Sequence, residues 1–180
     1  DSNIVTPVQN ADIDINLKES EREKHEHGER KGISVEEMEQ IIAEADSMKD
    51  QIVLKCLGGL GCRPSDLKDI RLQDVDLKRE RVKIRSTKTT NTREIPISES
   101  LKDYLNLWLN HGYRDGCYYA NESEYLIPGE RGEQLGDRAI SRVVERNAEK
   151  VEGIQRVIYE SSDGREHKRV TPYSFRVGYI

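Results

Sequence analysis

The stretch Gly58-Gly59-Leu60-Gly61-Cys62-Arg63-Pro64-Ser65-Asp66-Leu67 decides how we expect the chain to fold. Proline suits the first position of a helix, because its fixed φ is helical and the N–H that it lacks would have no partner there. Pro64 therefore predicts a helix that begins directly after a glycine-rich break. Arg63 takes the position at the N-terminus of that helix.

Arg63 is placed where an anion would bind. The free backbone N–H groups and the positive end of a helix dipole favour negative charge, and a guanidinium beside them can donate to two phosphate oxygens. Asp66 follows three residues later, near enough to hold that guanidinium in place. The alternative is an ordinary surface ion pair between Arg63 and Asp66, which would contribute little to stability.

The composition of the 180 residues indicates one soluble, helix-containing domain with a disordered portion, because 35% are charged and only 34% are hydrophobic. No apolar run approaches the roughly 18 residues of a membrane span, so no membrane partner is expected. The cysteines, Cys56, Cys62 and Cys117, show no C-x-x-C spacing. We interpret them as reduced thiols of a cytoplasmic protein and expect no zinc or other metal site.

The net charge of -5 is unevenly distributed along the chain. Residues 1–50 carry 14 acidic and 6 basic side chains, whereas residues 51–180 carry 20 acidic and 23 basic ones. The acidity is therefore local, and a nucleic-acid partner is not excluded. Residues 1–31 have no sustained apolar period and are predicted to be a linker or disordered tail, so the domain is expected to span residues 32–180.

Helical patterns open the predicted domain. Ser34 and Glu37 form the reciprocal capping box of a helix start, and apolar residues then recur at helical spacing. A second, more uniformly apolar helix is predicted over about Asp50 to Leu57, ending at Gly58-Gly59, and should lie deep in the core. The third helix begins at Pro64.

A β-hairpin is predicted after these helices, because the apolar period changes to two. Val82 and Ile84 alternate with basic residues, and Ile95 follows a polar loop. The outward row of Lys and Arg, and the small hydroxyl residues around Lys88 in the loop, suit contacts with phosphates. A solvated charged face is the alternative. The candidate DNA-binding residues of this hairpin are Lys83, Arg85, Thr87, Thr89 and Arg93.

The next elements are a helix capped by Ser98, a short strand at Tyr125-Leu126-Ile127 and a basic helix from about Asp137 to Lys150. Apolar residues at helical spacing in the basic helix are expected to face the core. Arg138 and Arg142 face outward in this prediction, and they are further candidates for DNA binding.

A second arginine is expected at a helix start near the end of the chain. A second hairpin is predicted around Ser161-Ser162-Asp163-Gly164, since Asp-Gly is a hairpin turn signal. Thr171-Pro172 then predicts another helix start, with Thr171 as its cap. Tyr173 and Arg176 lie three residues apart and project from one face of that helix.

The chemistry-bearing motifs are Gly-Cys-Arg-Pro-Ser-Asp-Leu at residues 61–67, Ser-Thr-Lys-Thr at 86–89 with Thr-Arg-Glu-Ile-Pro-Ile at 92–97, and Thr-Pro-Tyr-Ser-Phe-Arg at 171–176. Together they resemble the catalytic domain of the tyrosine recombinases, the phage integrase family, which shows G-x-R-x-x-E-L, T-K-T with T-R-E-V-P-L, and T-P-H-x-L-R-H in this order. The resemblance spans roughly residues 32–180. It implies an α+β, mostly helical fold of the DNA breaking-rejoining type with a small antiparallel β-hairpin sheet.

The resemblance also implies a reaction on double-stranded DNA without metal or nucleotide cofactor, and self-association on DNA in the full-length protein. Arg63 and Arg176 would grip the scissile phosphate, and Lys88 would protonate the leaving 5′ oxygen. Asp66 stands where the family usually has Glu and would support the first arginine. These roles suit phosphoryl transfer, which depends mainly on positioning and on stabilising charge at the phosphate oxygens.

Departures from the family pattern affect the catalytic set. Tyr173 stands in place of the usual His, and Val177 stands where a second His often follows. A phenol, with a pKa of about 10, is a poorer proton acceptor near neutrality than imidazole. The family's nucleophilic tyrosine matches no residue of the chain, since Tyr179 is too close to Arg176. We therefore expect a fragment that cannot cleave DNA alone, from a parent that forms a 3′-phosphotyrosine intermediate.

Alternative functions are left open by the sequence. One is a relative of the integrases that binds DNA but has lost catalysis, an alternative motivated by Tyr173 and Val177. The other is a small interaction domain that uses its basic hairpin to bind an acidic protein partner.

Overall fold

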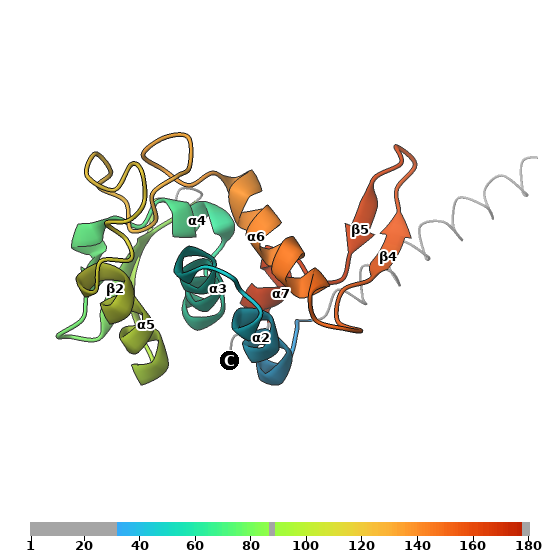
Figure 1. Cartoon of the computed structure of the whole chain (residues 1–180), viewed down its shortest axis with the longest axis horizontal. Coiled ribbons are helices and arrows are strands. Elements are labelled where there is room, and N and C mark those ends of the chain that lie inside the picture. The colour runs from blue at the N-terminus through green and yellow to red at the C-terminus, as the bar shows by residue number, and fades with distance from the viewer. Residues whose placement is uncertain (1–31, 87–88, 178–180) are drawn as a thin grey trace, which may run out of the picture.

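The computed structural model describes residues 32–86 and 89–177 (Figure 1). They form an α+β fold in which helices predominate, as the resemblance implies. The predicted linker at residues 1–31 lies outside the described residues, as do residues 87, 88 and 178–180. In chain order the elements are α2 (Val35–Ala43), α3 (Met48–Leu60), α4 (Pro64–Lys68), the 3-10 helix η1 (Leu72–Asp74), β1 (Val75–Asp76), β2 (Arg81–Arg85), β3 (Thr92–Pro96), α5 (Glu99–Asn110), α6 (Asp137–Glu149), β4 (Val157–Glu160), β5 (Glu166–Lys168) and α7 (Pro172–Val177).

Helix α3 lies at the centre of the molecule and packs against α2, α5, α6 and α7 (Figure 1). The apolar residues from Ile52 to Leu57 are fully buried, as their sequence predicts. The predicted end of this helix at Gly58-Gly59 is wrong. The helix continues to Leu60 and ends at Gly61, whose φ of 56° is left-handed and favours glycine.

Gly58 and Gly59 serve packing within the helix. A Cβ atom on Gly58 would collide with the side chain of Met38 in α2, and one on Gly59 would come within 2.8 Å of the Leu101 side chain in α5. Glycine therefore allows both neighbouring helices to approach α3 closely, and this close approach outweighs the low helix propensity of glycine.

The predicted starts of α2, α4 and α5 are confirmed. The backbone N–H of Ser34 donates to Glu37, and that of Glu37 donates to the Ser34 hydroxyl, so both halves of the capping box form. Pro64 is the first residue of α4. The Ser98 hydroxyl accepts from the backbone N–H of Leu101 at the start of α5.

The predicted hairpin is confirmed as β2 and β3, and β1 adds a third antiparallel strand. Val82 and Ile84 are buried, whereas the basic residues that alternate with them, Arg81, Lys83 and Arg85, are exposed. In the register of the hairpin, Ile84 pairs with Arg93. Residues directly opposite one another share a face of the sheet, so Arg93 lies on the inner face and not in the outward basic row.

The predicted strand at Tyr125-Leu126-Ile127 is wrong, because Tyr125 forms only an isolated bridge with Arg71. The carbonyl oxygens of Tyr125 and Leu126 accept hydrogen bonds from the buried guanidinium of Arg114, and that of Leu126 also accepts from Trp108. The side chains of Arg114 and Trp108 therefore donate to backbone carbonyls that, in a β-strand, would accept hydrogen bonds from a neighbouring strand.

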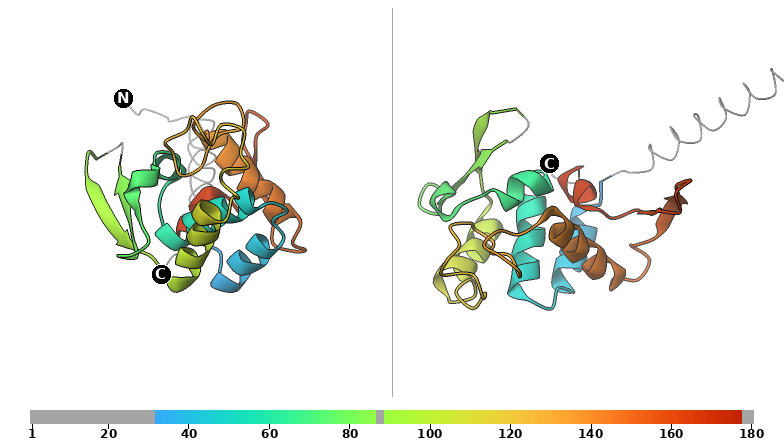
Figure 2. Two further views of the ribbon diagram at one scale, coloured as in Figure 1. Left: turned by 60° about the vertical axis from the view of Figure 1, so that its left-hand side comes forward. Right: turned by 90° about the horizontal axis from the view of Figure 1, so that it is seen from above.

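The two hairpins lie at opposite ends of the molecule. Figures 1 and 2 show β2–β3 at one end and β4–β5 at the other, with α4 and α7 between them. The turn of the second hairpin contains Gly164 with a φ of 77°, as the Asp-Gly pair predicts. Among the helices of the described residues, none is long and apolar enough to cross a membrane.

Candidate active site

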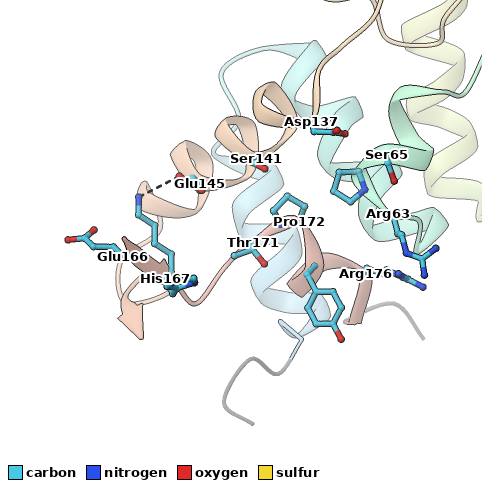
Figure 3. Close-up of a pocket in the computed structure, with 13 residues that line it drawn as sticks. Arg63, Ser65, Asp137, Ser141, Glu145, Glu166, His167, Thr171, Pro172 and Arg176 are labelled. Atoms are coloured by element: carbon cyan, nitrogen blue, oxygen red, sulfur yellow. Dashed lines mark ion pairs between the residues drawn. The ribbon is translucent and has the colours of Figure 1, made fainter. Parts of the chain in front are cut away.

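A pocket of about 810 Å³ opens between α4, α6, β5 and α7. Figure 3 shows Arg63 and Arg176 at one end of this pocket, and Glu166 and His167 at the other. The two arginines come from helices that are far apart in the chain. Their predicted convergence on one pocket is therefore seen in the structure.

Local geometry delivers Arg63 to the pocket. After the left-handed Gly61, Arg63 is extended at the N-cap position, with a φ of -72° and a ψ of 154°. Pro64 then starts α4 and lines the pocket beside Arg63. This arrangement follows the prediction made from the glycine-rich stretch.

Packing of α7 delivers Arg176. Phe175 is fully buried, and the Ser174 hydroxyl donates to the carbonyl of Arg169 while it accepts the backbone N–H of Thr171 at 3.1 Å. The predicted capping role of Thr171 is therefore reversed, since the serine hydroxyl caps the N–H of Thr171. With these residues fixed, Arg176 projects into the pocket (Figure 3).

Asp66 supports Arg63 differently from the prediction. Its Oδ2 atom accepts the backbone N–H of Arg63 at 3.4 Å and lies 3.9 Å from Nη2 of Arg93. Within residues 32–86 and 89–177, no ion pair joins Asp66 to the guanidinium of Arg63. The expected contact is absent because a carboxylate at the third helical position points back at the N-cap backbone.

The candidate DNA-binding residues of the hairpin fall into separate groups. Arg85 donates to the buried carboxylate of Asp74, and Arg93 pairs with Asp66, so the helical body engages both arginines. Lys83 and Thr89 are exposed, and Lys83 belongs to no ion pair in the described part of the chain. The other two candidates, Thr87 and Lys88, lie outside the described residues.

The candidates on α6 are exposed but do not line the pocket. Arg138 is exposed, and Arg142 borders a separate hollow together with Lys49 and Arg146. Arg146, on the same helix, donates to both carboxylate oxygens of the buried Asp50. The outward position of Arg138 and Arg142 is confirmed, and their contact with DNA stays a prediction.

Tyr173 lines the pocket and is 55% exposed. The pocket contains a histidine as well, but His167 comes from β5 and lies at the end opposite the two arginines (Figure 3). His167 is therefore not placed where the family pattern has its histidine, beside the second arginine.

Sequence reasoning missed the charged far end of the pocket. Lys168 pairs with Glu149 at 2.6 Å and with Glu145 at 3.7 Å. These ion pairs join elements that are distant in the chain, and no local motif marks them. They partly neutralise the acidic side chains of this end.

The buried thiol of Cys62 lies next to the arginine end of the pocket. Burial is the largest cause that raises the pKa of Cys62 to about 12, and the charge of Asp66 raises it further. The charges of Arg93 and Arg176 act in the opposite direction. Cys62 therefore stays a neutral thiol near pH 7, and the described residues contain no cluster that could hold a metal ion.

Known proteins similar to this chain include tyrosine recombinases. The chain is 26% identical over 121 residues to tyrosine recombinase XerA of Pyrococcus horikoshii, over 67% of this chain and 41% of that protein. It is 32% identical over 111 residues to tyrosine recombinase XerC of Corynebacterium glutamicum, over 62% of this chain and 34% of that protein. The chain thus spans less than half the length of these relatives.

Solved structures share the fold. A crystal structure of XerA recombinase gives a TM-score of 0.62 at 22% identity, over 81% of this chain and 46% of that chain. The lambda integrase catalytic core gives a TM-score of 0.56 at 18% identity, over 82% of this chain and 80% of that chain. A sequence profile of the phage integrase family matches residues 31–178. Since this match covers most of the sequence, the chain belongs to the phage integrase family.

Proposed function

We propose that this chain is the catalytic-domain part of a site-specific tyrosine recombinase acting on double-stranded DNA, and that Arg63 and Arg176 hold the scissile phosphate. The observation that carries the proposal is the convergence of these guanidinium groups on one end of one pocket (Figure 3). Two guanidinium groups can donate to both non-bridging oxygens of a phosphodiester. They also stabilise the charge that develops on these oxygens in the transition state.

Strand cleavage is a displacement at phosphorus. A tyrosine hydroxyl loses its proton and its oxygen forms the new bond to phosphorus. The bond from phosphorus to the 5′ oxygen breaks, and a proton reaches that oxygen as it leaves. From the family resemblance we assign the delivery of this proton to Lys88. The nucleophile has no counterpart among the 180 residues, so we infer that cleavage needs a tyrosine from outside them.

Tyr173 takes the place of the family's histidine in this scheme. Its hydroxyl can donate to a phosphate oxygen, but a neutral phenol is a weaker proton acceptor than a neutral imidazole. We therefore assign Tyr173 to phosphate binding and not to proton transfer.

The partners follow from this assignment. Lambda integrase has been solved bound to DNA, as a dimer on a core site and as a tetramer on a Holliday junction. We extend a DNA partner and self-association on DNA to the parent of this chain, which would act in the cytoplasm without a metal or nucleotide cofactor. The exposed residues that would add DNA contacts are Lys83, Thr89, Arg138 and Arg142.

DNA binding can be tested on the chain itself. Fluorescence anisotropy of a labelled duplex at several salt concentrations gives the dissociation constant and its salt dependence. Arg63→Ala and Arg176→Ala should each weaken binding about tenfold and reduce the log-log salt slope by about one. Lys102→Ala is the matched control, because Lys102 lies on α5 outside the pocket and pairs with Glu80. Unchanged affinity in both arginine variants would contradict the proposal.

A second candidate is a DNA-binding relative without catalysis. It is favoured by Tyr173 at the family's histidine position and by the location of His167 at the far end of the pocket (Figure 3). Incubation of the full-length protein with a nicked suicide duplex separates the two candidates. A protein–DNA adduct that survives denaturant supports the recombinase, whereas intact binding without any adduct supports the second candidate.

A further inference from the structure

Arg93 joins the hairpin to the start of α4. Its Nη2 atom lies 3.9 Å from Oδ2 of Asp66, and the same oxygen accepts the backbone N–H of Arg63 at 3.4 Å. The side chain of Asp66 is 1% exposed, whereas that of Arg93 is 47% exposed. A nearly fully buried carboxylate therefore contacts both Arg93 and the backbone of the arginine that faces the pocket.

The charge of Asp66 acts on its surroundings. Burial is the largest cause of the raised pKa of Cys62, and the charge of Asp66 raises this pKa further. The charges of Arg93 and Arg176 lower it. The thiol of Cys62 thus lies within electrostatic reach of all three side chains. Screening is weak in the protein interior, so a carboxylate without a positive partner at this place would repel an incoming phosphate.

We propose that Arg93 is a positioning residue of the phosphate site, which neutralises Asp66 and holds the β2–β3 hairpin against the start of α4. Arg63 then meets the phosphate beside a neutral ion pair and not beside a bare carboxylate. This inference rests on the proposed function, since it takes Arg63 to bind a DNA phosphate. It differs from the sequence-based prediction that Arg93 itself contacts DNA.

Arg85 and Asp74 provide a control within the same hairpin. Asp74 is also buried, accepts the backbone N–H of Arg71 at a helix start at 3.0 Å, and pairs with a hairpin arginine. The difference is that Asp66 contacts the backbone of Arg63, which lines the pocket, whereas the residues paired with Asp74, Arg71 and Arg85, do not line it. If Arg93 served only to anchor the hairpin, loss of Arg85 would weaken DNA binding to the same extent.

The test is a double-mutant cycle on the affinity of the chain for a labelled DNA duplex. Arg93→Gln leaves the Asp66 charge unpaired, and we expect binding about tenfold weaker, within the range of coupling between contacting residues. Asp66→Asn removes the charge but keeps a side-chain oxygen that can accept the Arg63 N–H. The double variant should return to within about threefold of the wild-type affinity, because the charges are again balanced.

The controls distinguish positioning from direct contact. Lys83→Gln removes one exposed charge from the same hairpin, and Asp66→Asn should not restore its affinity. Arg85→Gln should change the affinity less than about threefold, because its partner Asp74 contacts the backbone of Arg71, which does not line the pocket, and not that of Arg63. Thermal unfolding of every variant identifies those that lose affinity through loss of folding.

Two results would overturn the role of Arg93. One is a folded double variant that binds as weakly as Arg93→Gln, which would indicate a direct DNA contact. The other is an equal loss in Arg85→Gln, which would indicate simple anchoring of the hairpin. Either result together with the expected loss of affinity in Arg63→Ala refutes only this inference, whereas unchanged affinity in both Arg63→Ala and Arg176→Ala refutes the proposed function.

Discussion

Replacing Arg114 by methionine should lower the free energy of unfolding by about 3 kcal/mol. Arg114 is 5% exposed and donates to the backbone carbonyls of Ala120, Ser123, Tyr125 and Leu126 at 2.7 to 3.3 Å. Each hydrogen bond contributes about 1 kcal/mol net, and a buried carbonyl left without a donor costs a similar amount. Burial of the guanidinium, which lowers the pKa of Arg114, offsets part of this stabilisation.

Trp108 makes the effect measurable. It is the single tryptophan of the chain, it is 1% exposed, and its indole N–H donates to the Leu126 carbonyl at 2.9 Å. Its fluorescence during urea unfolding therefore reports on the loop that Arg114 organises. Arg131→Met is the control, since Arg131 is exposed in the same loop. If Arg114→Met lowers the free energy of unfolding by less than about 1 kcal/mol, the stabilising role of Arg114 is refuted, because the carbonyls would then have found other donors.

The loop also supports the pocket. Gln134 donates to the carbonyl of Lys68 at 3.2 Å and to the Asp69 carboxylate at 2.6 Å, both at the end of α4. Loosening this loop in Arg114→Met should therefore weaken DNA binding as well. Anisotropy measured under conditions where the variant is still folded checks this expectation.

Further predictions concern pH and packing. A hydrogen bond from Arg169 is the main cause that lowers the pKa of Glu37 below its usual 4.5, so the folded protein binds fewer protons there than the unfolded chain. The Glu37–Arg169 contact therefore stabilises the fold fully at a pH above the pKa of Glu37 in the unfolded chain, and this stabilisation is lost as the pH falls through the lower pKa of Glu37 in the folded protein. Glu37→Gln should remove this contribution to the acid dependence of the free energy of unfolding, measured by urea unfolding. Gly58→Ala should destabilise the protein by about 1–3 kcal/mol, because its Cβ would collide with Met38, whereas Gly132→Ala meets no atom within 4 Å and should be close to neutral in the same assay.

The sequence alone was sufficient to predict a structural feature wherever the interacting residues are near neighbours in the chain. The capping box of Ser34 and Glu37, the helix start at Pro64 and the alternation of β2 were predictable because each depends on backbone geometry and side chains within a few residues. The position of Arg63 at a helix start was visible for the same reason, since Pro64 follows it directly. Arg176, also predicted at a helix start, lies instead in the last turn of the short helix α7.

Tertiary structure decided the features in which distant groups compete with local preference. Helix α3 runs through Gly58-Gly59 because Met38 and Leu101 pack closely against it, and the residues around Tyr125 form no strand because Arg114 takes their carbonyls. The partner of Asp66 is Arg93, which the strand register brings to the inner face of the hairpin. Burial and hydrogen bonding by groups distant in sequence contribute energies as large as local propensities, so only the folded chain determines which of them prevails.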